Sequence, residues 1–223
     1  MPGYWTKTQA FLQQLRANNT KEWFEANKAA YDTRWRAPAF ALVEAVADEM
    51  AALNPALKAE ARINGSVRRI NRDVRFAKDK TPYSARLHLV FWAGSHPNRS
   101  AGMHLVIHPD GYGFGAGAFG LNPDQLAATR ARIMRQEERG TLLQAVAQAQ
   151  AIGCAFDAPD LKRLPKGHEA DPEWEHLLRR KAFVMRTQQN LAGPDWRDLD
   201  HARTEVMRLT RACAGLIRWL MTA

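Results

Sequence analysis

Three zones of different hydrophobic periodicity divide the chain. Up to about residue 60, apolar residues such as Trp35, Leu42 and Val46 recur at helical spacing. From about residue 65 to 118 the pattern favours strands, most clearly in "ARLHLVFWAG" and "GMHLVIHPDGYGFGAG", where Asp110-Gly111 is a hairpin signal. From residue 119 onward helical spacing returns, with one more strand expected in "KAFVMRTQ".

Helix-start signals predict where individual helices begin in the first and third zones. Thr6 with Gln9, and Asn122 with Gln125, have capping-box spacing, while Thr20 is suited to cap the segment "KEWFEANKAAY". Pro38 predicts a kink or a new helix. Helices, then strands, then helices predict one α+β domain over residues 1–223: helical over 1–60, a sheet of about four strands over roughly 65–118, and mainly helical over 119–223. We therefore expect a central antiparallel sheet flanked by N- and C-terminal helices.

One segment of the chain carries most of its net positive charge. The chain of 223 residues has a formal net charge of +9, and the segment from Arg62 to Arg86 has eight Lys or Arg against two Asp, a net of +6. Cys154 and Cys213 have no zinc-motif spacing, and lone thiols are typical of a reducing compartment. The N-terminus lacks a signal-peptide pattern, and no apolar run is long enough to span a bilayer. These features predict a cytoplasmic protein with no membrane partner, and they do not indicate an oligomeric state.

Five separated motifs resemble one known family. They are "NNTKEWFEANKAAYD" at 18–32, "RINRDVRFAKDKTPY" at 69–83, "GFGAGAFGLNPDQL" at 113–126, "LKRLPKG" at 161–167 and "LRRKAF" at 178–183. In this order and spacing they resemble the domain of unknown function 2461 family, which is composed of conserved uncharacterised proteins of bacteria and fungi. The resemblance covers nearly the whole chain. It implies a single α+β domain and assigns no activity and no catalytic residue.

The basic segment "RRINRDVRFAKDKTPY" is the main candidate site. Arginine binds phosphate and carboxylate groups through two parallel hydrogen bonds, and the two aspartates cannot neutralise the eight cations of residues 62–86, which keep an excess of +6. We therefore expect a basic pocket for a small phosphorylated or carboxylate ligand, and leave open whether the protein is an enzyme. Asp73, Asp79 and Tyr83 are the groups that could take part in catalysis. The ligand-binding candidates are Arg69, Arg72, Arg75, Lys78 and Lys80, joined by Lys166 if its turn folds against this segment.

Two alternatives explain the same charge. A nucleic-acid-binding protein would use these cations together with exposed aromatic residues such as Trp92 or Tyr112. A structural or interaction module would instead tie the charges into an internal lattice of ion pairs, in which Arg69, Arg72 and Asp73 are buried and paired.

The remaining motifs favour structure over chemistry. Gly115-x-Gly117-x-x-Gly120 matches a dinucleotide fingerprint in letters only, because the glycines alternate as in a strand. Such a bare strand face admits a close neighbour, and we expect a packed helix there more than a ligand. There is no Walker, HExxH or nucleophile-elbow motif, and we expect no cofactor. A metal site formed by His88, His104 and His108 is the weaker alternative.

Overall fold

The N-terminal part of the chain is helical. The computed structural model describes residues 3–97, 99–118, 120–187 and 196–221. Thr20 caps the second helix, with its hydroxyl accepting from the Trp23 backbone N–H, as expected. The first helix has Trp5 as its N-cap and no side-chain cap, so the predicted Thr6 capping box does not form. The elements are α1 (Thr6–Ala17), α2 (Lys21–Ala26), α3 (Lys28–Tyr31), a π-helical turn η1 (Asp32–Arg36) and α4 (Ala37–Ala51), which begins one residue before Pro38.

Within the described ranges the sheet has five strands, and every neighbouring pair is antiparallel. The order across the sheet is β1 (Leu87–Trp92), β2 (Gly102–His108), β3 (Gly111–Ala118), β5 (Phe183–Thr187) and β4 (Cys154–Phe156). The hairpin at Asp110-Gly111 joins β2 to β3, as predicted. The antiparallel sheet and the helices at both ends of the chain confirm the α+β domain.

The described residues of the C-terminal part form four helices and two strands. Asn122 caps α5 with a complete capping box, in which its side chain accepts from Gln125 N–H and the Gln125 side chain accepts from Asn122 N–H. The next helix begins at Gln136 and runs through Gly140. These elements are α5 (Pro123–Met134), α6 (Gln136–Gln150), α7 (Pro172–Leu178) and α8 (Leu199–Met221). No helix in the described ranges is both long and apolar enough to cross a bilayer.

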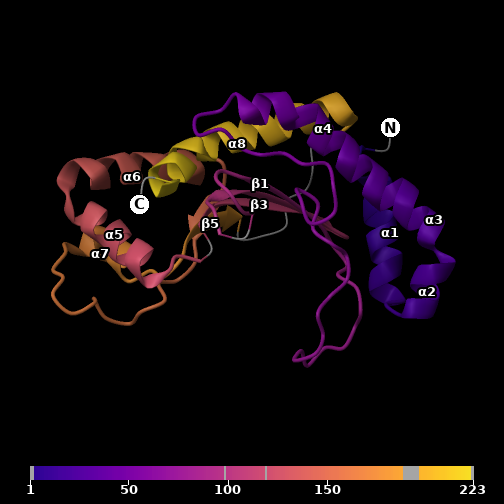
Figure 1. Cartoon of the computed structure of the whole chain (residues 1–223), viewed down its shortest axis with the longest axis horizontal. Coiled ribbons are helices and arrows are strands. Elements are labelled where there is room, and N and C mark those ends of the chain that lie inside the picture. The colour runs from indigo at the N-terminus through magenta and orange to yellow at the C-terminus, as the bar shows by residue number, and fades with distance from the viewer. Residues whose placement is uncertain (1–2, 98, 119, 188–195, 222–223) are drawn as a thin grey trace.

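Among the described residues, the helices that pack on the sheet cover one of its two faces. Figure 1 shows α4, α6 and α8 lying along one side of the strands, and α8 packs on β3 and β2. Side chains such as Leu89, Leu105 and Met185 point to this side and are fully buried. The alternate positions, such as His88, His104 and Val106, face the other side and are half-buried. The uncovered face is the feature that positions the candidate site.

The sheet differs from the prediction between residues 65 and 86. This segment forms no regular strand, and only isolated bridges connect Val67 with Leu89 and Asn71 with Tyr83. The strands that widen the sheet beyond β3 come from residues 154–156 and 183–187, inside the zone expected to be mainly helical. The prediction of strands was therefore wrong for residues 65–86, whereas the strand expected at "KAFVMRTQ" is confirmed as β5.

The glycines of β3 allow β5 to approach closely. A Cβ atom on Gly115 would lie 2.6 Å from the Met185 carbonyl oxygen, and one on Gly117 would collide with the Phe183 carbonyl. Gly117 also has φ of +145°, which residues with side chains rarely adopt. The neighbour that needs these glycines is thus a strand, and the helix expected against this face is absent among the described residues.

Candidate functional site

A cavity of about 510 Å³ lies on the uncovered face of the sheet. Its floor includes Gly113 and Gly115 of β3, and its sides are formed by the two flanking strands and by the loop between β1 and β2. Such a volume is typical of small-molecule sites. The side chains and glycines that line it are Arg68, Arg86, His88, Pro97, Ser100, His104, Val106, Gly113, Phe114, Gly115, Val184, Arg186 and Thr187.

Strand register brings three arginines to this face. Arg68 donates its backbone N–H to the His88 carbonyl, which sets residue 68 beside β1 opposite His88. Arg86 precedes His88 by two residues and so shares its side of the strand. Arg186 pairs with Gly115, which in turn pairs with His104. Three segments that are separate in sequence therefore supply arginines to the lining of one cavity, and the Arg186 guanidinium is paired with Asp157.

Two histidines form a contact in this cavity. His88 Nε2 and His104 Nδ1 are 2.9 Å apart, so one ring donates and the other accepts. Burial, with the nearby His104, Arg86 and Arg68, lowers the pKa of His88 to about 3. Burial and Arg68 lower the pKa of His104 to about 4. Both rings are therefore neutral at pH 7, and the positive charge of the cavity comes from the arginines.

A second hollow of about 290 Å³ adjoins the cavity. It shares Arg68, Arg86 and His88 with the cavity, and every residue that lines it is polar, so we call it the polar hollow. The lining of the two hollows together holds five arginines (Arg68, Arg69, Arg72, Arg86 and Arg186) and one aspartate. Within the described ranges, the side chains of Arg69 and Arg86 make neither a hydrogen bond nor an ion pair. The second hollow is lined by Arg68, Arg69, Asn71, Arg72, Asp73, Ser84, Arg86 and His88.

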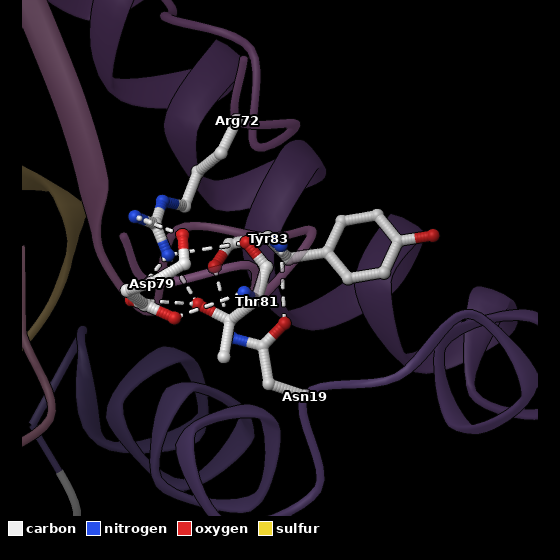
Figure 2. Close-up of polar contacts among 5 residues, drawn as sticks. All are labelled: Asn19, Arg72, Asp79, Thr81 and Tyr83. Atoms are coloured by element: carbon white, nitrogen blue, oxygen red, sulfur yellow. Dashed lines mark hydrogen bonds and ion pairs between the residues drawn. The ribbon is translucent and has the colours of Figure 1, made fainter. Parts of the chain in front are cut away.

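Residues 70–84 form an irregular hairpin at the edge of this site. Arg72 N–H donates to the Pro82 carbonyl, and Ser84 N–H donates to the Ile70 carbonyl, which closes the base of the hairpin. Figure 2 shows the Arg72 guanidinium directed at Asp79 and Thr81. Arg72 pairs with Asp79 at 2.6 Å and also contacts the Thr81 hydroxyl. The Arg72 side chain thus holds the loop together while it lines the polar hollow.

Asn19 anchors the hairpin to the N-terminal helices. Its side-chain amide donates to the Tyr83 carbonyl at 2.9 Å, and its carbonyl oxygen accepts from the Tyr83 N–H at 3.1 Å (Figure 2). The Tyr83 ring stacks on Phe24, with centroids 4.1 Å apart. The first two family-like motifs, at 18–32 and 69–83, therefore form one structural unit.

The three groups suggested for catalysis have structural partners. Hydrogen bonds from the backbone and side chain of Thr81 and from Arg72 lower the pKa of Asp79 to about 2. Hydrogen bonds from Arg75 lower the pKa of Asp73. Burial, followed by nearby Glu25 and Glu22, raises the pKa of Tyr83. At neutral pH these shifts keep both aspartates ionised and the tyrosine protonated.

The predicted ligand-binding cations divide into two groups. Arg69 and Arg72 line the polar hollow. Arg75 pairs with Asp73 at 2.7 Å, Lys80 donates to the Val74 and Arg75 carbonyls, and Lys78 is exposed. These three lie in the outer part of the hairpin and line neither hollow.

Lys166 does not join the site. Its segment, 157–171, lies below α5 and α7, at the opposite end of the sheet from the hairpin of residues 70–84 (Figure 1). Lys166 lines neither the cavity nor the polar hollow. The single continuous pocket that would combine Lys166 with Arg72 is therefore not formed.

The charged segment is only partly an ion-pair lattice. Its two aspartates pair with Arg75 and Arg72, but Asp73 and Asp79 are exposed and Arg69 is exposed as well. A buried, mutually paired lattice of Arg69, Arg72 and Asp73 is thus absent. Exposed pairs of this kind contribute little to stability.

The aromatic residues suggested for base stacking are buried. Trp92 is 2% exposed and Tyr112 is 5% exposed, and both lie in the sheet. Phe76, at the tip of the hairpin, is instead 96% exposed and lies under the Arg75 guanidinium. Stacking by Trp92 or Tyr112 is therefore ruled out in this conformation.

The three histidines do not assemble as metal ligands. His108 faces the same side of the sheet as His88 but pairs with Gly111 at the end of β2. In the described ranges, no group of three His, Cys, Asp or Glu residues is arranged to hold a metal ion.

Sequence reasoning missed Arg68, Arg86 and Arg186 as site residues. Arg68 and Arg86 lie within or next to the segment that was singled out, and their same-face position follows once β1 is paired with residues 66–68. The signal for Arg186 was weaker, because it depends on β5 pairing with β3 across 71 residues, from Gly115 to Arg186.

Comparison with known proteins identifies a family for the chain. Residues 7–219 match the family described as "Conserved hypothetical protein (DUF2461)". Neither the comparison with curated proteins nor the comparison with solved structures gave a match. Because the match spans nearly all of the 223 residues, the chain belongs to the DUF2461 family of conserved hypothetical proteins.

Proposed function

We propose that the protein binds a small phosphorylated or carboxylate ligand on the uncovered face of its sheet. The observation that carries the proposal is the convergence of five arginines and one aspartate on two adjoining hollows. Arginine is the side chain best suited to planar, paired hydrogen bonds with such groups. Arg69 and Arg86, which have no ion-pair partner in the described ranges, are the most available donors.

The cavity also supports a small ligand over a polymer. It is a bounded hollow of about 510 Å³ whose walls include the loop between β1 and β2. A cytoplasmic setting is part of the proposal, supported by Cys154 and Cys213, which are both buried free thiols.

Arg86→Ala tests the proposal. We expect isothermal titration of the wild type with a panel of nucleotides, sugar phosphates and dicarboxylates to give saturable binding of at least one compound. Loss of one charged hydrogen-bond donor should weaken that binding roughly tenfold or more. Arg135→Ala, an exposed arginine between α5 and α6, is the matched control and should bind as the wild type does. Absence of binding across the panel, or equal affinity in the wild type and Arg86→Ala, would refute the proposal.

Single-strand nucleic-acid binding is the second candidate. It is favoured by Phe76, an exposed aromatic residue next to Arg75 and within two residues of Lys78. Binding of a single-stranded oligonucleotide should weaken steeply between 50 and 200 mM salt and should weaken further in Phe76→Ala. A small-ligand site should show a much shallower salt dependence and no effect of Phe76→Ala.

A further inference from the structure

The two adjoining hollows differ in chemistry. The cavity on the sheet has apolar lining residues, Pro97, Val106 and Val184, together with two glycines. The polar hollow has none, and its lining adds Arg69, Asn71, Arg72, Asp73 and Ser84 to the shared residues. Arg68, Arg86 and His88 belong to both hollows and mark the boundary between them. A ligand that spans this boundary would meet an apolar surface on one side and hydrogen-bond donors on the other.

Two glycines of β3 form part of the floor of the cavity. Gly113 and Gly115 line the cavity between Val106 and His104 on β2 and Arg186 on β5. At Gly115 the place of a side chain is taken by β5, whereas a Cβ atom on Gly113 would have the Thr187 hydroxyl, at 3.1 Å, as its near neighbour. Peptide planes without side chains accept a flat group in van der Waals contact. A bare phosphate would fill only a small part of about 510 Å³ and would leave this surface unused.

The histidines at the boundary are suited to a neutral group. His88 and His104 satisfy each other through one hydrogen bond, which uses one donor and one acceptor. Their pKa values, about 3 and about 4, leave both rings uncharged at pH 7. Because the Arg186 guanidinium is paired with Asp157, the uncharged imidazoles and the aliphatic side chains of the cavity favour an apolar or aromatic ring over a second anionic group.

The polar hollow is suited to a doubly charged group. Arg68, Arg69, Arg72 and Arg86 line it, and Asp73 is the one acid among its lining residues. Asp73 is already paired with Arg75 outside the hollow. Several guanidinium groups around one small hollow match a phosphate monoester, with its two negative charges and three acceptor oxygens, better than a single carboxylate.

We infer that the ligand is a phosphate monoester that carries a planar ring system, with the ring on the glycine floor and the phosphate in the polar hollow. This inference rests on the proposed function and deepens it, because it assigns separate parts of one ligand to the two hollows. It predicts that neither a ring nor a phosphate alone reproduces the affinity of the joined molecule.

The test uses three related probes: AMP, adenosine, which lacks the phosphate, and ribose 5-phosphate, which lacks the ring. Calorimetric titration of the full-length protein should give AMP an affinity at least roughly tenfold above that of either part, since stacking of a ring adds this much or more. Inorganic phosphate should bind no more tightly than ribose 5-phosphate.

Two variants separate the hollows. Val106→Phe fills the cavity above the glycine floor and should remove the advantage of AMP over ribose 5-phosphate while ribose 5-phosphate still binds. Arg69→Ala should weaken AMP and ribose 5-phosphate by the same factor and leave adenosine unchanged. Thermal unfolding checks that each variant is folded, and Val184→Phe, on the neighbouring strand, replaces Val106→Phe if the latter is not.

The outcomes distinguish this inference from the proposed function. Equal binding of AMP, ribose 5-phosphate and inorganic phosphate would overturn the two-part ligand and leave the anion site standing. Equal binding of adenosine and AMP would overturn the inference and count against the anion site as well. If neither AMP nor ribose 5-phosphate binds the wild type but dicarboxylates do, the phosphate assignment is wrong while the proposed function survives.

Discussion

Acidification should destabilise the protein through the histidine pair. His88 and His104 have pKa values of about 3 and about 4 in the folded protein, against an ordinary value of 6.5. Below pH 6.5 both residues bind protons in the unfolded chain and stay neutral in the folded one. The unfolded state therefore gains protons, and stability falls as the pH falls from about 6.5 towards 3.

The size of this effect follows from the two shifts. Each pKa unit corresponds to about 1.4 kcal/mol. Between pH 7 and pH 5 a histidine that titrates only in the unfolded chain costs about 2 kcal/mol, so the pair costs up to about 4 kcal/mol. Because both rings are half-buried, we expect the observed value to lie between about 2 and 4 kcal/mol. Most carboxylates titrate below this pH window and contribute little to it.

Urea unfolding followed by tryptophan fluorescence at pH 7, 6 and 5 measures this loss. The double variant His88→Gln/His104→Gln has no titrating group at these positions, so its free energy of unfolding should change less with pH, by about 2–4 kcal/mol over the window. His96→Gln alters an exposed histidine of the loop between β1 and β2 and should keep the wild-type dependence. The same dependence on pH in the wild type and the double variant would refute the reasoning, whatever their stabilities at pH 7.

Two further substitutions test how the site is built. In Gly115→Ala the new methyl group would lie 2.6 Å from the Met185 carbonyl oxygen, so β5 must shift at a cost of about 1–3 kcal/mol in thermal stability. The control Gly120→Ala, whose new methyl group has no atom within 4 Å, should change thermal stability by less than about 0.5 kcal/mol. Equal stabilities of the two variants would contradict this role of Gly115. Asn19→Ala removes both hydrogen bonds to the Tyr83 backbone and should lower the free energy of unfolding in urea by about 1–3 kcal/mol. The control Asn18→Ala, whose side-chain amide donates to the Gln14 carbonyl of its own helix, should lower the free energy of unfolding by less. A loss in Asn19→Ala no greater than that in Asn18→Ala would show that the anchor is dispensable.

The elements that the sequence predicted well depend on local signals. Asp110-Gly111 specifies its hairpin because the turn needs those residues, and Asn122 with Gln125 specifies the start of α5 because both bonds of the capping box are local. The helical spacing expected after residue 119 is realised most fully in α8, from residue 199 to 221, since its apolar stripe is long and regular.

The elements that were missed depend on partners far along the chain. The three residues of β4 carry too little pattern to be identified, and β4 exists because β5 offers it an edge. Alternation over 67–76 resembles a strand, yet polar and charged residues occupy both of its sides, so neither side can be buried in the core. This segment instead forms a hairpin that is closed at its base by backbone hydrogen bonds and anchored by Asn19.

The position of the charge has a physical reason that the sequence alone did not disclose. Helices α4, α6 and α8 bury one face of the sheet, and the other face is left without helical cover in the described ranges (Figure 1). Residues 66–68 run beside β1, so that Arg68 falls on the uncovered face opposite His88, with Arg86 on the same side. A dense basic segment can therefore lie next to a core strand without burying its charges. Strand alternation places the apolar side chains of β1 on the helix-covered face and Arg68 and Arg86 on the other face. The sequence alone did not show which face of the sheet stays without helical cover, because that depends on where α8 packs. It also did not show that β5 adds Arg186 to the side of the cavity opposite β1, because that depends on the pairing of β5 with β3.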